Sequence, residues 1–352
     1  MKIMILDKIA DQLKTMTQAV LYGVTNRYAL AISSLKPAPG LDRIGVFFSM
    51  VEGSEDQELV FSFSKAGLIQ AFLDNEEYPV EIMSYATDFN KRNKGLVDES
   101  VLQKVVVTII GLGSGGSSIV LDLIRCGVTH LTLIEFDTVS LSNLCRSVYT
   151  LADVGRKKTE AILDKALSIN PCVRLTLIDE DVLEMDIEKL EEIIGQSDLI
   201  IEATDSPQTK ILINGRACHS TPVIYPAVYE EGKGGDIFFS FPGFPCYECV
   251  FHSVIKHMLE NTDLEWDYTT GQAKPMPALI ADIQVVCART VKLALAILTG
   301  DQENSFLSKV IKPGCTLLLI GNEKGVSVFP EAFGEAWVET HIDPECSCQT
   351  LE

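Results

Sequence analysis

Three glycines in the middle of this chain of 352 residues have a spacing that suits phosphate binding. Gly111, Gly113 and Gly116 follow the apolar run VVVTII and precede SSIVLDLIRCGV, whose apolar residues have helical spacing. In nucleotide-binding βαβ units, such glycines let backbone amides at a helix N-terminus approach phosphate oxygens. The stretch GLGSGG therefore predicts a phosphate-binding loop, and a glycine-rich turn without a ligand is the simpler alternative.

Two acidic residues follow the next apolar run, HLTLI. Glu135 lies about 20 residues after the glycines, where nucleotide-binding units place the acid that holds the ribose hydroxyls. Asp137 either assists Glu135 or caps the next turn, which is the commoner role for aspartate. Both residues are candidate nucleotide ligands.

Cationic and amide side chains come soon afterwards, in a chain of formal net charge −20. Asn143, Arg146 and Lys158 suit an enzyme that attacks the α-phosphate of ATP, because that reaction needs charge neutralisation around the phosphates. A hydride-transfer site, which leaves the pyrophosphate intact, has little use for them. Asp205, in the turn EATDS, is the candidate ligand for Mg²⁺. Read singly, Arg146 or Lys158 is an ordinary solvated charge and Asp205 an ordinary helix cap.

Four cysteines form two close pairs, Cys246 with Cys249 and Cys346 with Cys348. The CxxC spacing of the first pair lets two thiolates reach one tetrahedral Zn²⁺. The CxC spacing of the second pair is tighter, so Cys348 is the least secure ligand and His252 is its substitute. Plain thiols and a redox couple remain the alternatives to a structural zinc site.

The elements that must position these residues alternate regularly after Gln103. Buried strands and amphipathic helices follow one another, which predicts an α/β fold with a Rossmann-like, mainly parallel sheet and helices on both faces. We expect strands at 105–110, 130–136, 173–179, 197–204, 222–228 and 234–241, and helices at 117–126, 157–168 and 277–299, with one more helix ending at Arg216. A polar crossing is expected at 260–275. Residues 1–95, with short apolar stretches and turn signals, are predicted to form a small α+β or mostly β module, and residues 96–352 the main domain.

Composition narrows the class of protein. Apolar residues make up 47% and charged residues 22%, as in folded globular proteins. The acidic net charge argues against nucleic acid or an anionic membrane as a partner. No apolar run is long enough to span a bilayer and the N-terminus lacks the pattern of a signal peptide, so a cytoplasmic location is expected.

Six segments occur in a fixed order along the chain: GLGSGG, LIEFDTVSLSNLCR, DVGRKKTEA, INP, EATD and PCYEC. Together they resemble the adenylating domain of the ThiF/MoeB family, which is related to ubiquitin-activating enzymes and to the microcin-adenylating enzyme MccB. The resemblance covers about residues 103–300, with a tail to Cys348.

The resemblance implies a role for each candidate residue. The glycine loop would surround the ATP phosphates, and Glu135 would hold the ribose, where the family more often has Asp. Asn143 and Arg146 match the ATP contacts of the SNLxR motif. Lys158 matches the lysine on the phosphates, and Asp205 matches the acid that helps hold Mg²⁺.

Two further expectations come from the resemblance alone. The family is typically a homodimer in which an arginine from the partner reaches the ATP, and Arg92 in FNKRNKGL loosely matches that arginine. An interdomain linker charge is an equal interpretation of Arg92. Family members often transfer the activated carboxyl to a cysteine before the long helix, but residues 250–286 contain none and Cys287 lies inside the apolar helix.

The leading hypothesis is therefore ATP-dependent adenylation of the C-terminal carboxylate of a ubiquitin-like protein, a sulfur carrier or a peptide, without covalent transfer to the chain's own cysteine. A noncatalytic partner subunit of an activating enzyme is the main alternative, and an NAD-dependent oxidoreductase is the third. Residues 1–95 would recognise the substrate or build the dimer.

Overall fold

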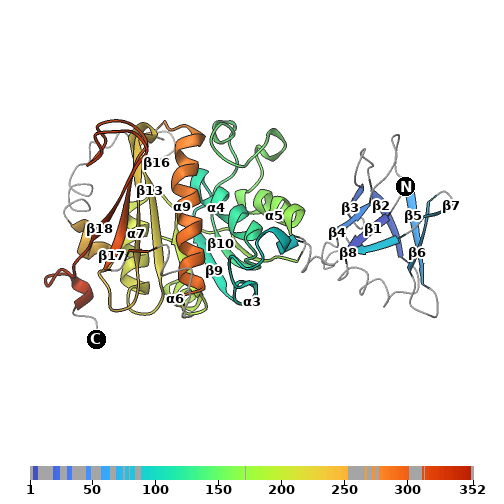
Figure 1. Ribbon diagram of the computed structural model, residues 1–352, viewed down its shortest axis with the longest axis horizontal. Helices are drawn as coiled ribbons and strands as arrows, with labels where there is room; N and C mark the ends of the chain where they lie inside the picture. The colour runs from blue at the N-terminus through green and yellow to red at the C-terminus, as the bar shows by residue number, and fades with distance from the viewer. Residues whose placement is uncertain are drawn as a thin grey trace. The chain divides into compact units, whose positions relative to one another are not determined.

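The computed structural model describes residues 89–170, 172–252, 277–300, 311–312 and 314–349, together with short strands before residue 84 and between residues 266 and 273. The chain divides into two compact units, Met1–Lys94 and Gly95–Glu352. Both units can be followed in Figure 1.

The described elements of the first unit, up to residue 83, are all strands. A four-stranded antiparallel sheet has the order β2-β5-β6-β7, and two further pairs are β3 with β4, antiparallel, and β1 with β8, parallel. The bounds are β1 Ile3–Leu6, β2 Ala19–Gly23, β3 Leu30–Ser33, β4 Gly45–Phe48, β5 Gln57–Phe63, β6 Ile69–Leu73, β7 Glu76–Tyr78 and β8 Val80–Met83. A short 3-10 turn, η1 (Asn90–Arg92), ends this unit.

An eight-stranded sheet of order β11-β10-β9-β12-β13-β14-β17-β18 forms the centre of the second unit. The first five strands are parallel, and the last three are antiparallel to their neighbours. The bounds are β9 Val106–Ile110, β10 His130–Ile134, β11 Arg174–Ile178, β12 Leu199–Glu202, β13 Val223–Val228, β14 Gly234–Ser240, β17 Cys315–Gly321 and β18 Gly334–Glu339. The predicted mainly parallel α/β sheet is confirmed.

Helices cover both faces of this sheet, because the strands are apolar on both sides (Figure 1). Ile109 and Ile201 point into one core, which is closed by α4, α5, α9 and the short α3. Ile110 and Ile200 point into the other core, which is closed by α6 and α7. The bounds are α3 Glu99–Leu102, α4 Ser114–Arg125, α5 Lys158–Ile169, α6 Ile187–Gly195, α7 Pro207–Ala217 and α9 Ile280–Leu298.

The structure differs from the sequence prediction at several elements. Helix α4 begins at Ser114 rather than at residue 117, because Gly113 takes the extended backbone of an N-cap and the helix includes the glycine-rich turn. Helix α6 and strands β17 and β18 were not predicted. The crossing expected at 260–275 lies outside the described residues, except for β15 (Trp266–Asp267) and β16 (Gln272–Ala273).

The order of the parallel strands creates a crevice. The chain runs outward from β9 through β10 to β11 on one side, and from β12 to β13 on the other. At such a reversal, the loops after the two central strands diverge and ligands bind between them. The glycine loop follows β9 and the turn EATDS follows β12, so the topology brings these two motifs together.

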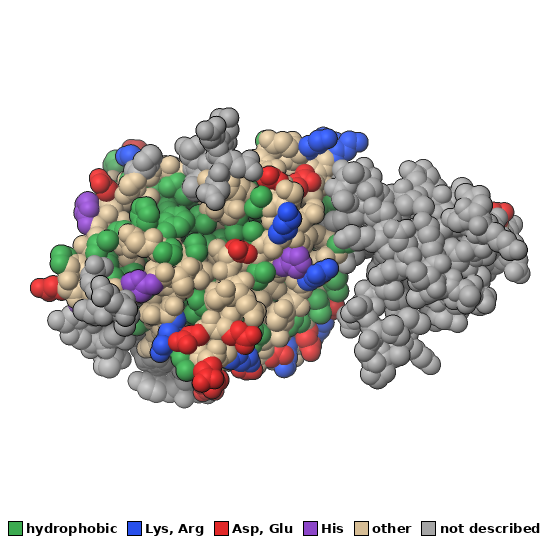
Figure 2. Space-filling model, turned by 90° about the horizontal axis from the view of Figure 1, so that it is seen from below, with side chains coloured by type: hydrophobic (Ala, Val, Ile, Leu, Met, Phe, Trp, Pro, Cys, Tyr) green, Lys and Arg blue, Asp and Glu red, His purple; other side chains and the backbone are tan. Residues whose placement is uncertain are grey.

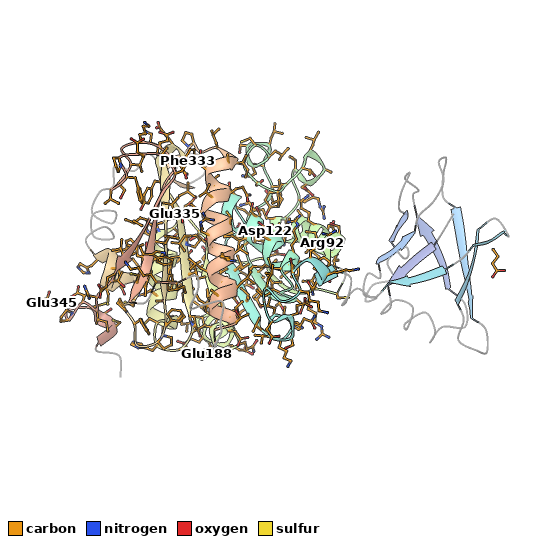
Figure 3. All side chains as sticks on the ribbon, in the orientation of Figure 1. Arg92, Asp122, Glu188, Phe333, Glu335 and Glu345 are labelled. Atoms are coloured by element: carbon orange, nitrogen blue, oxygen red, sulfur yellow. The ribbon has the colours of Figure 1, made fainter. Side chains whose placement is uncertain are left out.

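The surface of the second unit carries both signs of charge. Lys and Arg side chains are interspersed with Asp and Glu on the face in Figure 2. One ion pair joins the long helix α9 to the edge strand β18, since Arg289 Nε lies 2.6 Å from Glu335 Oε1. Figure 3 labels Glu335 on that strand. Among the helices that the structure describes, none combines the length and the apolar character that crossing a bilayer requires.

Candidate nucleotide site and cysteine cluster

The glycine loop has two positions where only glycine fits. Gly111 has φ +89°, and a Cβ there would lie 2.9 Å from Thr204 Cγ2. A Cβ on Gly116 would lie 1.9 Å from the carbonyl oxygen of Gly111. A Cβ on Gly113, in contrast, would meet no atom of the described residues within 4 Å. Gly113 caps α4, so the space beside the helix N-terminus suits a phosphate group.

Glu135 braces this loop from the end of β10. Its Oε2 accepts from the backbone N–H of Leu112 at 2.9 Å and from Lys158 Nζ at 3.2 Å. Its Oε1 accepts from the backbone N–H groups of Phe136 and Asp137, both at 3.0 Å. A carboxylate has about four acceptor positions, and all four are used. A ribose hydroxyl can therefore bind Glu135 only if one of these donors leaves.

Lys158 is the donor with an alternative partner. Its Nζ lies 2.8 Å from Asp137 Oδ2, and its backbone N–H donates to the Asp137 carbonyl. Lys158 and Glu135 are buried, whereas the Asp137 side chain is 37% exposed. The structure thus joins three predicted site residues, Glu135, Asp137 and Lys158, in one ion-pair cluster beside the glycine loop.

Asn143 and Arg146 lie on an excursion between β10 and α5. The excursion is closed at its base, because Thr138 pairs with Lys157 and the backbone N–H of Val139 donates to Arg156. Asn143 Oδ1 accepts from the backbone N–H of Ser140 at 2.8 Å, so this side chain stabilises the 3-10 turn η2 (Leu141–Asn143). Arg146 follows this turn and is half-buried.

Tyr149 is a supporting residue that the sequence did not reveal. Its hydroxyl donates to the carbonyl of Leu112 at 2.7 Å, and its side chain is buried. Burial and the nearby Glu135 raise the pKa of this phenol well above its ordinary value, so it remains a donor. Leu112 is therefore held at its N–H by Glu135 and at its carbonyl by Tyr149.

Asp205 lies across the crevice from the glycine loop. The backbone N–H of Ala203 donates to Ile110 at 2.9 Å, which joins the ends of β12 and β9. Ser206 is the N-cap of α7, and its hydroxyl accepts from the Thr209 N–H. The alternative that Asp205 is the helix cap is therefore wrong, and its carboxylate is exposed at the sheet edge. An exposed carboxylate beside a phosphate-binding loop suits Mg²⁺.

Arg92 lies at the end of η1, in the first unit, and is exposed. Three other polar residues near the carboxyl edge of the parallel strands were not predicted as part of the site. Glu202 and Lys210 form a buried ion pair below the Asp205 turn. Asp236 on β14 is buried and accepts from the Tyr229 hydroxyl at 2.9 Å. Glu202 lies within the quoted motif EATD, but buried charge is not visible in a motif.

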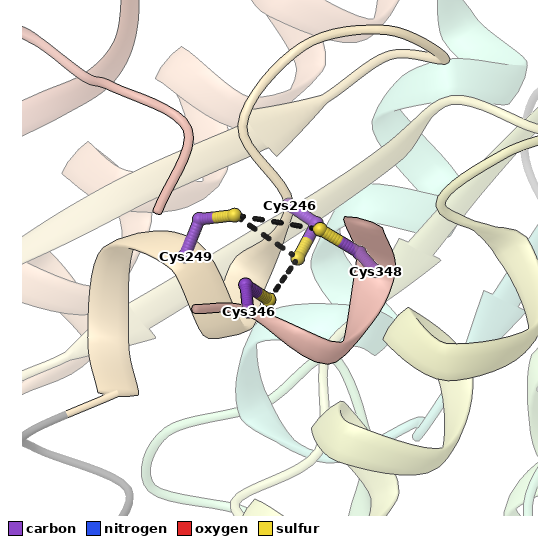
Figure 4. A group of neighbouring side chains, drawn as sticks. All are labelled: Cys246, Cys249, Cys346 and Cys348. Atoms are coloured by element: carbon purple, nitrogen blue, oxygen red, sulfur yellow. Dashed lines mark hydrogen bonds between the residues drawn. The ribbon is translucent and has the colours of Figure 1, made fainter. Parts of the chain in front are cut away.

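The four paired cysteines come together at one end of the sheet (Figure 4). All four Sγ atoms lie within 4.8 Å of one another. The Sγ of Cys246 lies 3.7 Å from that of Cys249 and 3.6 Å from that of Cys346, and the Cys249 and Cys348 Sγ atoms are 3.6 Å apart. Zn–S bonds of about 2.3 Å in a tetrahedron place the sulfurs about 3.8 Å apart. The donor set and its spacing therefore fit a zinc ion.

The CxC pair reaches the cluster because its chain turns tightly. Cys348 lies in the 3-10 turn η5 (Ser347–Gln349), which brings its Sγ to the same side as that of Cys346. His252 is exposed and does not belong to the cluster. Asn214 on α7 fastens the first pair, since its Nδ2 lies 3.5 Å from Cys246 Sγ and its Oδ1 accepts from the Tyr247 N–H.

The other thiols differ in exposure. Cys287 is buried on α9, and burial raises the pKa of its thiol to about 12, which disfavours a nucleophilic thiolate. Cys145, next to Arg146, is exposed, and its Sγ contacts the Ser142 carbonyl at 3.4 Å.

Comparison with known proteins identifies the family. The sequence model of the ThiF family matches residues 85–312. The chain belongs to the ThiF family. This ThiF-family chain is 31% identical over 172 residues to the molybdopterin-synthase adenylyltransferase of Escherichia coli, which covers 48% of the chain and 68% of the relative. It is 31% identical over 174 residues to the adenylyltransferase and sulfurtransferase MOCS3 of Arabidopsis thaliana, which covers 49% of the chain and 37% of the relative.

The chain spans well under half the length of the Arabidopsis relative. Among solved structures, it resembles Escherichia coli MccB with ATP, with a TM-score of 0.54 and 20% identity over 71% of the chain and 68% of MccB. At this identity the likeness concerns the fold, and it confirms the Rossmann-like architecture.

Proposed function

We propose that this chain adenylates the C-terminal carboxylate of a ubiquitin-like protein, a sulfur carrier or a peptide, with ATP as the second substrate. The observation that carries the proposal is the crevice between β9 and β12. There the glycine loop, the cluster of Glu135, Asp137 and Lys158, and the exposed Asp205 share one sheet edge. The named relatives are adenylyltransferases, which supports the same activity.

The chemistry requires that the substrate carboxylate oxygen attacks the α-phosphorus. The new bond is the P–O bond of an acyl adenylate, and the bond between the α- and β-phosphates breaks, so pyrophosphate leaves. Negative charge grows on the leaving group, and Lys158 and Arg146 would neutralise it. A divalent cation held by Asp205 would add to that neutralisation and orient the phosphates.

The occupied acceptors of Glu135 suggest how nucleotide binding and Lys158 are linked. A ribose hydroxyl that donates to Glu135 Oε2 would replace Lys158 Nζ there, at the longest of the four contacts. The released ammonium would then reach the phosphates from the same side of the glycine loop. Asp137 would retain or release the lysine according to the position of the phosphates.

ATP–pyrophosphate exchange tests this function. Exchange should depend on a ubiquitin-like protein or peptide with a free C-terminus, and candidates are those encoded beside this chain. Asp205→Ala should lower exchange more than about 10³-fold while the unfolding temperature stays unchanged, because the carboxylate is exposed and holds an ion. A noncatalytic subunit would show no exchange with any candidate, and an oxidoreductase would bind NAD instead.

We also propose that Cys246, Cys249, Cys346 and Cys348 bind one structural Zn²⁺. The four-sulfur donor set and the distances near 3.7 Å support this assignment. Purified protein should contain one zinc per chain, and chelation should lower the unfolding temperature. Less than one equivalent in protein purified without chelators would contradict the proposal.

The remaining assignments are proposals from the family resemblance. The protein would be a cytoplasmic homodimer in which Arg92 of one chain reaches the ATP of the other. Residues 1–95 would form an accessory module for substrate recognition or dimerisation, and residues 96–352 the adenylation domain. Mixing Arg92→Ala chains with Asp205→Ala chains should restore partial exchange if Arg92 acts across a dimer.

A further inference from the structure

A buried ion pair lies directly below the turn that carries Asp205. Glu202, the last residue of β12, is completely buried, and Lys210 on the first turns of α7 is nearly so. Lys210 Nζ contacts Glu202 Oε2 and also donates to the carbonyl of Thr204 at 2.7 Å. One lysine therefore joins the strand end, the turn and the helix.

Glu202 holds the same turn from its other oxygen. The backbone N–H of Thr204 donates to Glu202 Oε1 at 3.1 Å, and the Thr204 hydroxyl contacts that oxygen as well. The Ser206 N–H donates to the Thr204 hydroxyl oxygen at 3.3 Å. The residues on both sides of Asp205 are thus fixed by one network.

Thr204 connects this network to the glycine loop. Its Cγ2 methyl lies 2.9 Å from the position of a Cβ on Gly111, so the turn and the loop touch without room for a side chain between them. The backbone hydrogen bond from the Ala203 N–H to the Ile110 carbonyl joins the same two segments. A shift of Thr204 would therefore move Asp205 relative to the phosphate-binding loop.

Burying the two charges of this pair has a cost in free energy. Burial raises the pKa of Glu202, and Lys210 opposes that rise, so the two charges stabilise each other only against a large desolvation cost. Apolar side chains of similar volume often replace such a pair without loss of stability. The hydrogen bonds to Thr204, however, have no apolar substitute.

We propose that Lys210 and Glu202 are positioning residues that set Asp205 at the place where it binds the divalent cation of the nucleotide complex. This inference rests on the proposed function, because it assumes that the crevice binds a nucleotide with a divalent cation. Neither residue contacts the nucleotide in this scheme. Both act through the backbone and hydroxyl of Thr204.

The test measures cation binding directly. Mn²⁺ is titrated, by electron paramagnetic resonance, into the full-length protein saturated with the non-hydrolysable ATP analogue AMPCPP. The double variant Glu202→Leu/Lys210→Met replaces the pair with apolar side chains and removes every hydrogen bond from it to Thr204. We expect Mn²⁺ affinity to fall about 10–100-fold, the range for loss of a group that orients a metal ligand. AMPCPP binding without metal should be unchanged.

Two further variants separate positioning from folding. Lys189→Met makes the same lysine substitution on α6, where Lys189 forms an exposed ion pair with Glu180, and it should leave Mn²⁺ affinity at the wild-type value. Thr204→Val keeps a methyl group against Gly111 but removes the hydroxyl, and it should weaken Mn²⁺ binding by a smaller factor. Circular dichroism and the unfolding temperature monitor the fold of each variant, and Thr204→Val decides the question if the double variant does not fold.

Wild-type Mn²⁺ affinity in a folded double variant would overturn the inference and leave the proposed function intact. Wild-type affinity in Thr204→Val would overturn it when the double variant is unfolded. If the wild-type protein itself binds no AMPCPP, the proposed function fails and the inference fails with it. The wild-type titration therefore distinguishes the two failures.

Discussion

Two clusters of acidic and lysine side chains flank the glycine loop, and they differ in the exposure of their carboxylates. On the β10 side, Lys158 is shared between Glu135 and Asp137, at 3.2 and 2.8 Å, and the Asp137 side chain is 37% exposed. On the β12 side, the Glu202 side chain is 0% exposed and Lys210 only 10%. The two lysines are similarly buried, at 7% and 10%, so the difference lies in their carboxylate partners. Lys158 also contacts the partly exposed carboxylate of Asp137, whereas the only carboxylate that Lys210 contacts among the described residues is the fully buried one of Glu202.

This difference predicts separate roles for the two lysines, Lys158 and Lys210. Glu135 has three backbone donors besides Lys158, so it remains satisfied when the lysine leaves. Glu202 depends on Lys210 for its only cationic partner among the described residues. A buried charge that loses its partner is costly, whereas one that keeps several N–H donors is not. In the β10 cluster the lysine can therefore change partners, whereas the β12 cluster is suited to hold the turn that carries Asp205.

Lys158→Met should show the largest difference between the two clusters. We expect ATP–pyrophosphate exchange to fall about 10²–10³-fold, because a cation that stabilises the leaving group is lost. The free energy of unfolding should fall by only about 1 kcal/mol, since Glu135 keeps its backbone donors. Exchange assays and urea unfolding measure the two quantities.

Lys210→Met is the matched comparison for Lys158→Met, because it removes the same charge from the β12 cluster. It should lower the free energy of unfolding by about 3–5 kcal/mol, the range for breaking a buried pair. Equal losses of stability in the two lysine variants would contradict the proposal that the two lysines have separate roles.

Glu135→Gln should give a smaller effect on nucleotide binding. Glutamine has one oxygen acceptor in place of two, so two of the four donors to Glu135 lose their acceptor and the charge is lost. We expect AMPCPP affinity to fall about 10–100-fold, as for other hydrogen bonds to a charged group. Isothermal titration calorimetry measures the affinity, and an unchanged value would show that Glu135 does not brace the loop.

Asp236 should give the smallest effect, and it depends on pH. Burial raises the pKa of Asp236 to about 6, although the Tyr229 hydroxyl and Lys210 oppose the rise. The folded state therefore binds this proton more tightly than the unfolded state does. The stability that the protonated acid contributes is present below about pH 4 and is lost as the pH rises through about 6.

The comparison with Asp236→Asn isolates this proton from the other carboxylates. Between about pH 5 and pH 7 the wild type should lose about 1 kcal/mol of unfolding free energy relative to Asp236→Asn. Urea unfolding at several pH values measures the difference. A constant difference across this range would mean that Asp236 does not titrate there.

Periodicity in the sequence predicted the parallel part of the fold. Strands β9 to β13 and helices α4, α5 and α7 are local patterns of apolar residues, and each pattern is long enough to identify its element. Helix α6 and strands β17 and β18 were not predicted. The strand β17 is a single apolar run, CTLLLIG, and its identity depends on pairing with β14 and β18, which are distant in sequence.

The sequence predicted which residues belong to the candidate site, but not the contacts between them. Spacing selected Glu135 and Asp137, and charge together with the family resemblance selected Lys158, but neither could reveal that all four acceptors of Glu135 are used. The CxC pair looked too tight for one ion, because sequence spacing does not show how the chain turns at η5. Nothing in the sequence indicated that Lys210 is buried in an ion pair, since an isolated lysine on a helix is ordinarily solvated.

The sequence by itself determined the parallel strands and most of the helices that cover them, the glycines of the loop and the family. These depend on local backbone preference and on residues that lie near one another along the chain. Only the tertiary structure decided which charges are paired, which are buried and which remain at the surface, as with Lys158, Lys210 and Asp205. Those properties depend on the dielectric environment and on contacts across the sheet, and folding alone creates them.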